Sequence, residues 1–96
     1  MRPSESLARH RDEVLAVIAR YPVDNPCLYG SVARGSDSEG SDIDILVEDR
    51  EPMSTFELAD LELELEALLN TRVDVRLRAD LSKDVAGRVA SDLRPL

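Results

Sequence analysis

The chain contains no tryptophan, only one phenylalanine and two tyrosines, and a single cysteine, Cys27, among its 96 residues. One cysteine excludes an internal disulfide and is typical of a reducing compartment. The apolar neighbour Leu28 predicts that this thiol is buried and unreactive. No apolar run is long enough to cross a membrane, and the N-terminus lacks the apolar segment of a signal peptide. We therefore expect a cytoplasmic protein with no membrane partner.

Basic residues are also scarce. The chain has 12 lysines and arginines but 20 aspartates and glutamates, which gives a net charge of −8. An excess of negative charge repels phosphate backbones, so direct binding to nucleic acid is not expected. The length suits one domain with a modest core. We expect residues 1–96 to form that single domain.

A polar loop rich in glycine and serine ends in an alternating segment, residues 42–47. The alternation of Asp42 and Asp44 with β-branched residues is typical of a strand, so both carboxylates point to one face of a sheet. Their Cα atoms are then about 6.6 Å apart, and the two charges repel each other unless a cation lies between them. Mg²⁺ prefers oxygen ligands and often combines carboxylates with substrate phosphates, so the pair predicts a metal site.

Gly30 and Ser31 begin the same loop and suit a phosphate-binding turn. Gly30 permits a positive φ or a close backbone approach, and Ser31 is a good N-cap for a short helical turn through Arg34. The N–H groups at such a turn bind phosphate, and the Ser31 hydroxyl can add a hydrogen bond. Arg34 either contacts a phosphate or pairs with a surface acid, and the sequence leaves both interpretations open.

The Gly-Ser pair, ten further residues and the Asp-Ile-Asp triplet together resemble the signature of the DNA-polymerase-β-like nucleotidyltransferases. The fuller strings, residues 30–35 and 41–47, are similar to the minimal (MNT) branch of that superfamily. Members of this branch are often antitoxins paired with a HEPN ribonuclease toxin. The resemblance implies an α/β (α+β) fold, a small mixed β-sheet of three to four strands with helices packed on it.

A third carboxylate is implied by the same resemblance. Alternation over residues 72–77 predicts a strand in which Asp74 shares the face of Asp42 and Asp44. In the resembling family these three aspartates form the catalytic triad, which here would hold two Mg²⁺ ions. Asp74 would also take the proton from the attacking hydroxyl. Gly30 and Ser31 would hold the terminal phosphates of the substrate ATP.

Other periodic segments predict the remaining elements. We expect helices over residues 4–20, 55–69 and 83–91, strands over 26–29, 42–47 and 72–77, and a short edge strand over 93–96. Ser4 or Ser6 is expected to cap the first helix, and Ser54 forms a capping box with Glu57.

The helix over residues 55–69 has two apolar stripes. Leucines form the first stripe, which we expect to face the core. The second, nearly opposite, stripe consists of Phe56, Ala59, Leu63 and Ala67. Either the C-terminal part of the chain covers this second stripe, or it docks a partner helix or a second copy of the chain. The docking interpretation predicts a homo- or hetero-oligomer.

Two classes of function follow from this sequence. The first is a Mg²⁺-dependent enzyme that moves AMP from ATP to a protein hydroxyl, which the resemblance implies is a tyrosine of a HEPN toxin. The second is a non-catalytic module that neutralises the toxin by contact. An intact set of three carboxylates favours the enzyme. Nucleotidylation of antibiotics, as in the kanamycin-modifying relatives, requires a second domain for which 96 residues leave no room.

Overall fold

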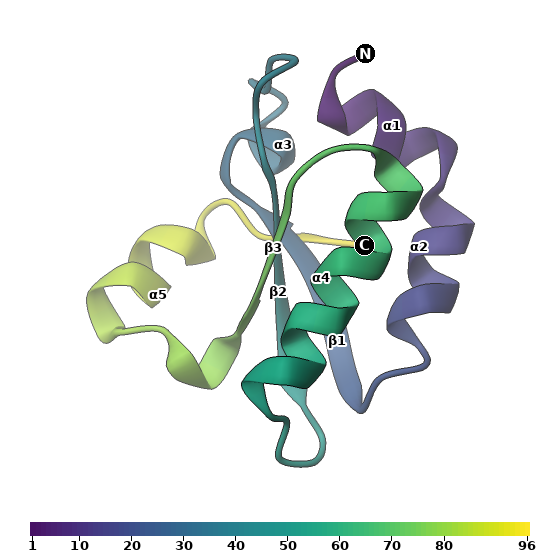
Figure 1. The fold of residues 1–96 in the computed structure, drawn as a ribbon. Coiled ribbons are helices and arrows are strands. Elements are labelled where there is room, and N and C mark those ends of the chain that lie inside the picture. Colours follow the sequence, from purple (N-terminus) through teal and green to yellow (C-terminus); the bar gives the residue numbers. More distant parts are fainter.

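A four-stranded mixed sheet forms the centre of the computed structural model, which describes residues 1–96 (Figure 1). Its strands are β1 (Val23–Tyr29), β2 (Ile43–Asp49), β3 (Val73–Leu77) and β4 (Arg94–Pro95). The spatial order is β3-β2-β1-β4. β1 runs antiparallel to β2 and to β4, whereas β2 and β3 are parallel. The predicted fold class is confirmed, and the expected edge strand is the fourth strand.

Five α-helices and a short 3₁₀ helix surround the sheet. They are α1 (Pro3–Arg9), α2 (Arg11–Ile18), α3 (Gly30–Arg34), α4 (Thr55–Leu69), η1 (Arg78–Asp80) and α5 (Lys83–Ala90). Helices α1, α2 and α4 lie together on one side of the sheet, and α5 lies on the other side of β3 (Figure 1). The core between the sheet and the first group includes Val14, Ile45, Leu61, Leu65 and Val75. The opposite face of the sheet is therefore the one available for a site.

The prediction of one continuous helix over residues 4–20 is wrong. The chain leaves helical geometry at His10, where φ is −115° and ψ is 18°, so two short helices replace the single one. Neither serine caps the first of them, because Pro3 is its first residue, a position where the missing N–H has no helical partner. Ser6 instead donates its hydroxyl to the carbonyl of Leu69 at 2.9 Å. This buried tertiary bond joins α1 to the end of α4, and no local sequence signal indicates it.

The long helix α4 follows its predicted boundaries. The Ser54 hydroxyl accepts the N–H of Glu57 while the Glu57 carboxylate accepts the N–H of Ser54, which is the predicted capping box. Asn70 ends the helix in the left-handed conformation, with φ of 53°. The first apolar stripe faces the core as expected, since Leu61 and Leu65 are fully buried.

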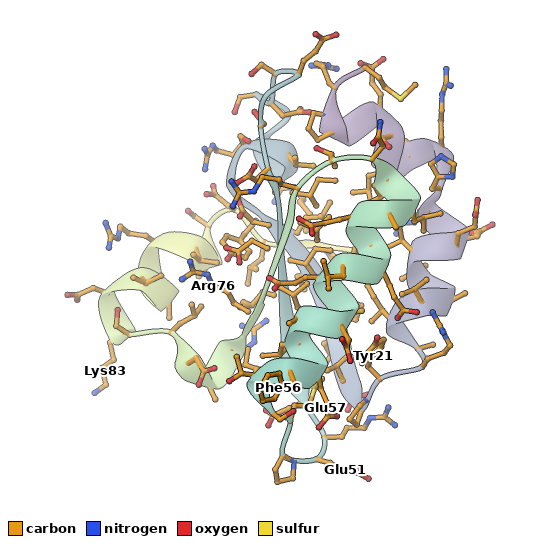
Figure 2. The ribbon with its side chains drawn as sticks, in the orientation of Figure 1. Tyr21, Glu51, Phe56, Glu57, Arg76 and Lys83 are labelled. Carbon is orange, nitrogen blue, oxygen red and sulfur yellow. The ribbon has the colours of Figure 1, made fainter.

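The two large side chains of the second stripe of α4 are exposed, so the first of the two interpretations, in which the C-terminal part covers the stripe, is wrong. The side chain of Phe56 is 83% exposed and that of Leu63 is 62% exposed. The reason is topological: α5 crosses to the far side of β3 and leaves the outer side of α4 open (Figure 2).

Cys27 is only partly buried, which corrects the expectation of a buried thiol. It pairs with Leu46 across β1 and β2, one register position from the core pair Leu28 and Ile45. Its side chain therefore lies on the face of the sheet away from the main core.

None of the helices combines the length and the apolar character that a bilayer crossing requires.

Candidate active site

Three side chains form a row across the face of the sheet opposite the core. Tyr29 is the register partner of Asp44 across β1 and β2, and Asp44 is the partner of Asp74 across β2 and β3. Register partners share a face, while the neighbouring positions Ile45 and Val75 are buried on the other side. The structure therefore brings Asp44 and Asp74 together on the predicted face.

Asp42 lies one residue before β2 and is exposed, whereas Asp44 is half-buried. Burial raises the pKa of the Asp44 carboxyl above its ordinary value, and the negative charges of Asp74 and Asp42 raise it further. Arg76 and Arg34 act in the opposite direction. The surroundings of Asp44, including the two neighbouring aspartates, therefore disfavour its ionised form.

Gly30 meets the Asp44 carboxylate at the end of β1. Its φ is +74°, and a Cβ added there would lie 2.5 Å from Oδ2 of Asp44. The positive φ and the close approach predicted for Gly30 are both present, but the group that approaches is a site carboxylate. The absence of a side chain at this position is therefore what lets Asp44 lie against the turn.

Ser31 is not the N-cap of the helical turn, which corrects the prediction. Tyr29 occupies the cap position, and α3 begins at Gly30, whose φ is +74°. The Ser31 carbonyl accepts the N–H of Ser36 at 2.9 Å. No side chain caps the start of α3 by a hydrogen bond.

Arg34 pairs with Asp92 at 2.7 Å, so the surface-acid interpretation describes this structure. Its charge nevertheless lies close enough to the site to oppose the rise in the pKa of Asp44. The ion pair joins the end of α3 to the segment after α5.

Tyr29 is a site residue that the sequence interpretation missed. Burial and the nearby Asp44 carboxylate raise the pKa of its phenol to about 12, so the hydroxyl stays protonated. The signal that could have identified it is the alternation of side chains along β1, which puts Tyr29 on the same face of the sheet as its register partner Asp44.

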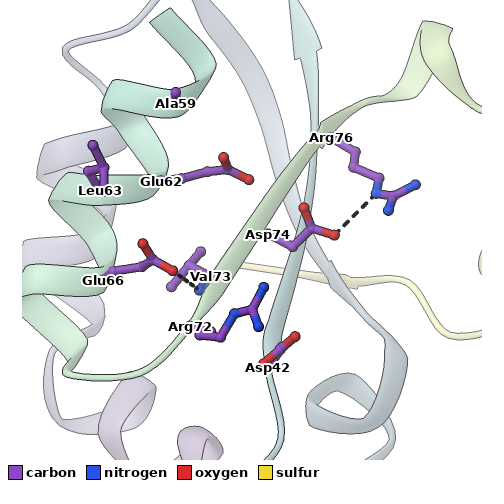
Figure 3. Close-up of a pocket in the computed structure, with 9 residues that line it drawn as sticks. All are labelled: Asp42, Ala59, Glu62, Leu63, Glu66, Arg72, Val73, Asp74 and Arg76. Atoms are coloured by element: carbon purple, nitrogen blue, oxygen red, sulfur yellow. Dashed lines mark hydrogen bonds and ion pairs between the residues drawn. The ribbon is translucent and has the colours of Figure 1, made fainter. Parts of the chain in front are cut away.

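A cavity of about 520 Å³ lies between α4 and β3, beside Asp74 (Figure 3). It is lined by Asp42, Ala59, Glu62, Leu63, Glu66, Arg72, Val73, Asp74 and Arg76. Asp74 forms an ion pair with Arg76 at 3.2 Å. The two glutamates were not identified from the sequence, although their four-residue spacing puts them on one side of α4.

The donor type of this site fits a hard divalent cation, although its carboxylates are not gathered around one point. No group of three or more His, Cys, Asp or Glu side chains is arranged so that it could hold a metal ion. Asp74 is turned toward Arg76 instead. Carboxylate oxygens are the ligands that Mg²⁺ prefers, and the repulsion that raises the pKa of Asp44 is what a bound cation would relieve.

A glycine turn beside aligned carboxylates on a small mixed sheet defines a protein of the nucleotidyl-transfer class. Residues 11–96 match the family model described as nucleotidyltransferase domain, and the chain belongs to that family. Protein adenylyltransferase MntA of Thermococcus cleftensis is 36% identical over 87 residues, which are 91% of this chain and 85% of the relative. By this homology the chain is a nucleotidyltransferase of the protein adenylyltransferase type.

Two solved structures share this fold. A minimal nucleotidyltransferase structure superposes with a TM-score of 0.85 at 36% identity and covers 97% of this chain and 95% of its own. A complex of a tri-AMPylated HEPN toxin with an MNT antitoxin from Shewanella oneidensis matches with a TM-score of 0.72. That match has 17% identity over 92% of this chain and 69% of the other, so it shows the fold alone.

Replacing Ser31 by alanine is expected to weaken the use of ATP without abolishing it. One neutral hydrogen bond contributes about 0.5–1.5 kcal/mol, so kcat/KM for ATP should fall by at most about tenfold. The backbone N–H groups of the turn remain in this variant. Steady-state kinetics beside a Ser36→Ala control would measure the difference, and a complete loss of activity would show that the hydroxyl also orders the loop.

Proposed function

We propose that this protein transfers AMP from ATP to a tyrosine hydroxyl of a HEPN toxin and thereby acts as its antitoxin. The observation that carries the proposal is the alignment of Asp44 with Asp74 on one face of the sheet, next to the Gly30 turn. Homology to a protein adenylyltransferase supports AMP as the transferred group. The relative solved with a tri-AMPylated HEPN toxin supports the class of partner.

In the proposed reaction the acceptor oxygen forms a bond to the α-phosphorus of ATP. The bond from that phosphorus to the bridging oxygen of the β-phosphate breaks, and pyrophosphate leaves. Asp74 takes the proton of the attacking hydroxyl. Gly30 and Ser31 hold the departing phosphates through a backbone N–H and the serine hydroxyl.

Asp42, Asp44 and Asp74 would hold Mg²⁺ in the working enzyme, two ions in the arrangement we propose. When bound, the metal neutralises charge on the α-phosphate and on the leaving pyrophosphate. Asp74 must then turn away from Arg76, with which it pairs in this structure. Arg34 is proposed as a further phosphate contact, which requires it to leave Asp92.

A second function, neutralisation of the toxin by contact alone, is favoured by one observation. The carboxylate of the proposed base is engaged in an ion pair with Arg76, and no metal-binding group of three carboxylates is formed. A degenerate member of the family would keep its partner surface without needing this site.

Asp74→Asn distinguishes these two functions. If the protein is an enzyme, the variant should bind the toxin and ATP but should neither modify the toxin nor neutralise it in cells. Mass spectrometry of the toxin and a growth assay measure both effects. Asp80→Asn, a change of an exposed acid just beyond β3, is the matched control. Unchanged neutralisation by Asp74→Asn would mean that contact alone suffices, and the enzymatic proposal would be withdrawn.

A further inference from the structure

The geometry points to the cavity between α4 and β3 as the acceptor subsite. We infer that it takes a polypeptide segment that carries a basic and an apolar side chain next to the hydroxyl that receives AMP. This inference rests on the proposed function and adds to it the side from which the acceptor approaches and the chemistry that recognises it.

The position of the cavity relative to the glycine turn supports this direction of approach. The turn at Gly30 follows β1, Asp44 lies on β2 and Asp74 on β3, and these strands are neighbours in that order. The cavity lies at the outer edge of β3 and includes Asp74 and also Asp42, which precedes β2, but neither Gly30 nor Ser31. In a displacement at phosphorus the attacking and leaving oxygens are roughly in line. If the leaving phosphates lie at the turn, the acceptor therefore enters past Asp74, from the cavity.

The outer edge of β3 is closed to pairing with another strand. Oε2 of Glu62 accepts the N–H of Val75 at 2.8 Å. Oε2 of Glu66 accepts the N–H of Val73 at 3.1 Å, the bond drawn from Glu66 in Figure 3. These N–H groups would otherwise be free to bind an added strand. An occupant must therefore be held by its side chains rather than as a fifth strand of the sheet.

The charge of the cavity favours a basic occupant. Glu62 and Glu66 line its α4 side, and they are not among the proposed metal ligands, whereas Arg72 and Arg76 line its β3 side. A lysine or arginine of the acceptor can therefore pair with the glutamates on the α4 side even when Asp42 and Asp74 hold metal.

An apolar wall extends from the same cavity. Ala59 and Leu63 line it, and Leu63 is 62% exposed. Phe56 lies two helical turns before Leu63 on α4, and its side chain is also exposed (Figure 2). An apolar side chain of the acceptor can pack here while its basic neighbour meets the carboxylates, and the hydroxyl then faces Asp74.

The test uses the HEPN toxin as acceptor and compares Leu63→Lys with Leu63→Met. The lysine removes the apolar contact and repels a basic segment, whereas methionine preserves the apolar surface. Because Leu63 is exposed, neither change should alter the melting temperature. Leu63→Lys should raise KM for the toxin by about tenfold or more while Kd for ATP stays unchanged, as expected for one residue at the centre of a small contact. Leu63→Met should behave as the unmodified protein.

Glu66→Gln tests the charge separately, because glutamine still accepts the N–H of Val73 but carries no charge. We expect a higher KM for the toxin and a weaker dependence of KM on salt. Unchanged KM in both Leu63→Lys and Glu66→Gln, with transfer by the unmodified protein intact, would overturn the subsite and leave the proposed function standing. No transfer by the unmodified protein would overturn both. If Leu63→Lys dissociates a dimer without changing KM for the toxin, the occupant of the cavity is a second copy of this chain and the acceptor assignment is wrong.

Discussion

Asp44→Asn is expected to lower AMP transfer by about a thousandfold or more, because a metal held by this carboxylate supplies several kcal/mol of stabilisation to the transition state. Asn is nearly the same size as Asp, so the fold should persist. Asp42→Asn should have the same effect on transfer. Asp49→Asn, at the exposed end of the same strand, is the control and should remain active. Full activity of either site variant would rule out the metal assignment.

The same Asp44→Asn change should raise the melting temperature of the metal-free protein at neutral pH. The pKa of Asp44 is raised in the folded state by burial and by Asp74 and Asp42, so its ionised form opposes folding. The folded protein is relatively more stable below the unfolded-state pKa of this carboxyl, and it loses that advantage as pH rises through the folded-state pKa. The gain from Asp44→Asn should therefore be largest at neutral pH and should vanish in acid. Melting curves over pH would measure it, and a gain that persists in acid would contradict the repulsion.

Gly30→Ala is expected to impair both stability and transfer. The left-handed backbone at Gly30 costs a residue with a side chain about 1–3 kcal/mol. The new Cβ would also lie 2.5 Å from Oδ2 of Asp44, so that carboxylate must move away from the site. Thermal melting and a transfer assay would together measure the loss.

Gly35→Ala is the matched control for this change. Gly35 has nearly the same φ, +73°, but no atom lies within 4 Å of the position of an added Cβ. It should show the loss of stability without the loss of transfer. Equal transfer by the two variants would mean that the contact between Gly30 and Asp44 has no part in the chemistry.

Local sequence signals were enough to predict most of the helices and strands. The capping box at Ser54 and the left-handed Asn70 mark the two ends of α4, and both act within a few residues of the helix terminus. The alternation over β3 placed Asp74 on the face away from Val73 and Val75. These predictions succeeded because capping and side-chain alternation depend on neighbours in the chain.

Long-range contacts explain the failures. The break at His10 accompanies a bond from Ser6 to Leu69, which lies 63 residues further along the chain. The exposure of the second stripe of α4 depends on the side of β3 to which α5 crosses. Neither choice has a local signal, because both are made when the elements pack.

The sequence alone therefore determined the turn at Gly30, the aspartates on one face of their strands and the class of chemistry that they favour, because each follows from residue type and spacing. Only the tertiary structure decided how close the Asp44 carboxylate lies to that turn, and that Tyr29 completes the row across the sheet. It also decided that Asp74 pairs with Arg76 and that Glu62 and Glu66 close the edge of β3. The physical reason is that the partner of a charged group is selected by strand register and helix packing, which bring together residues that the chain holds apart.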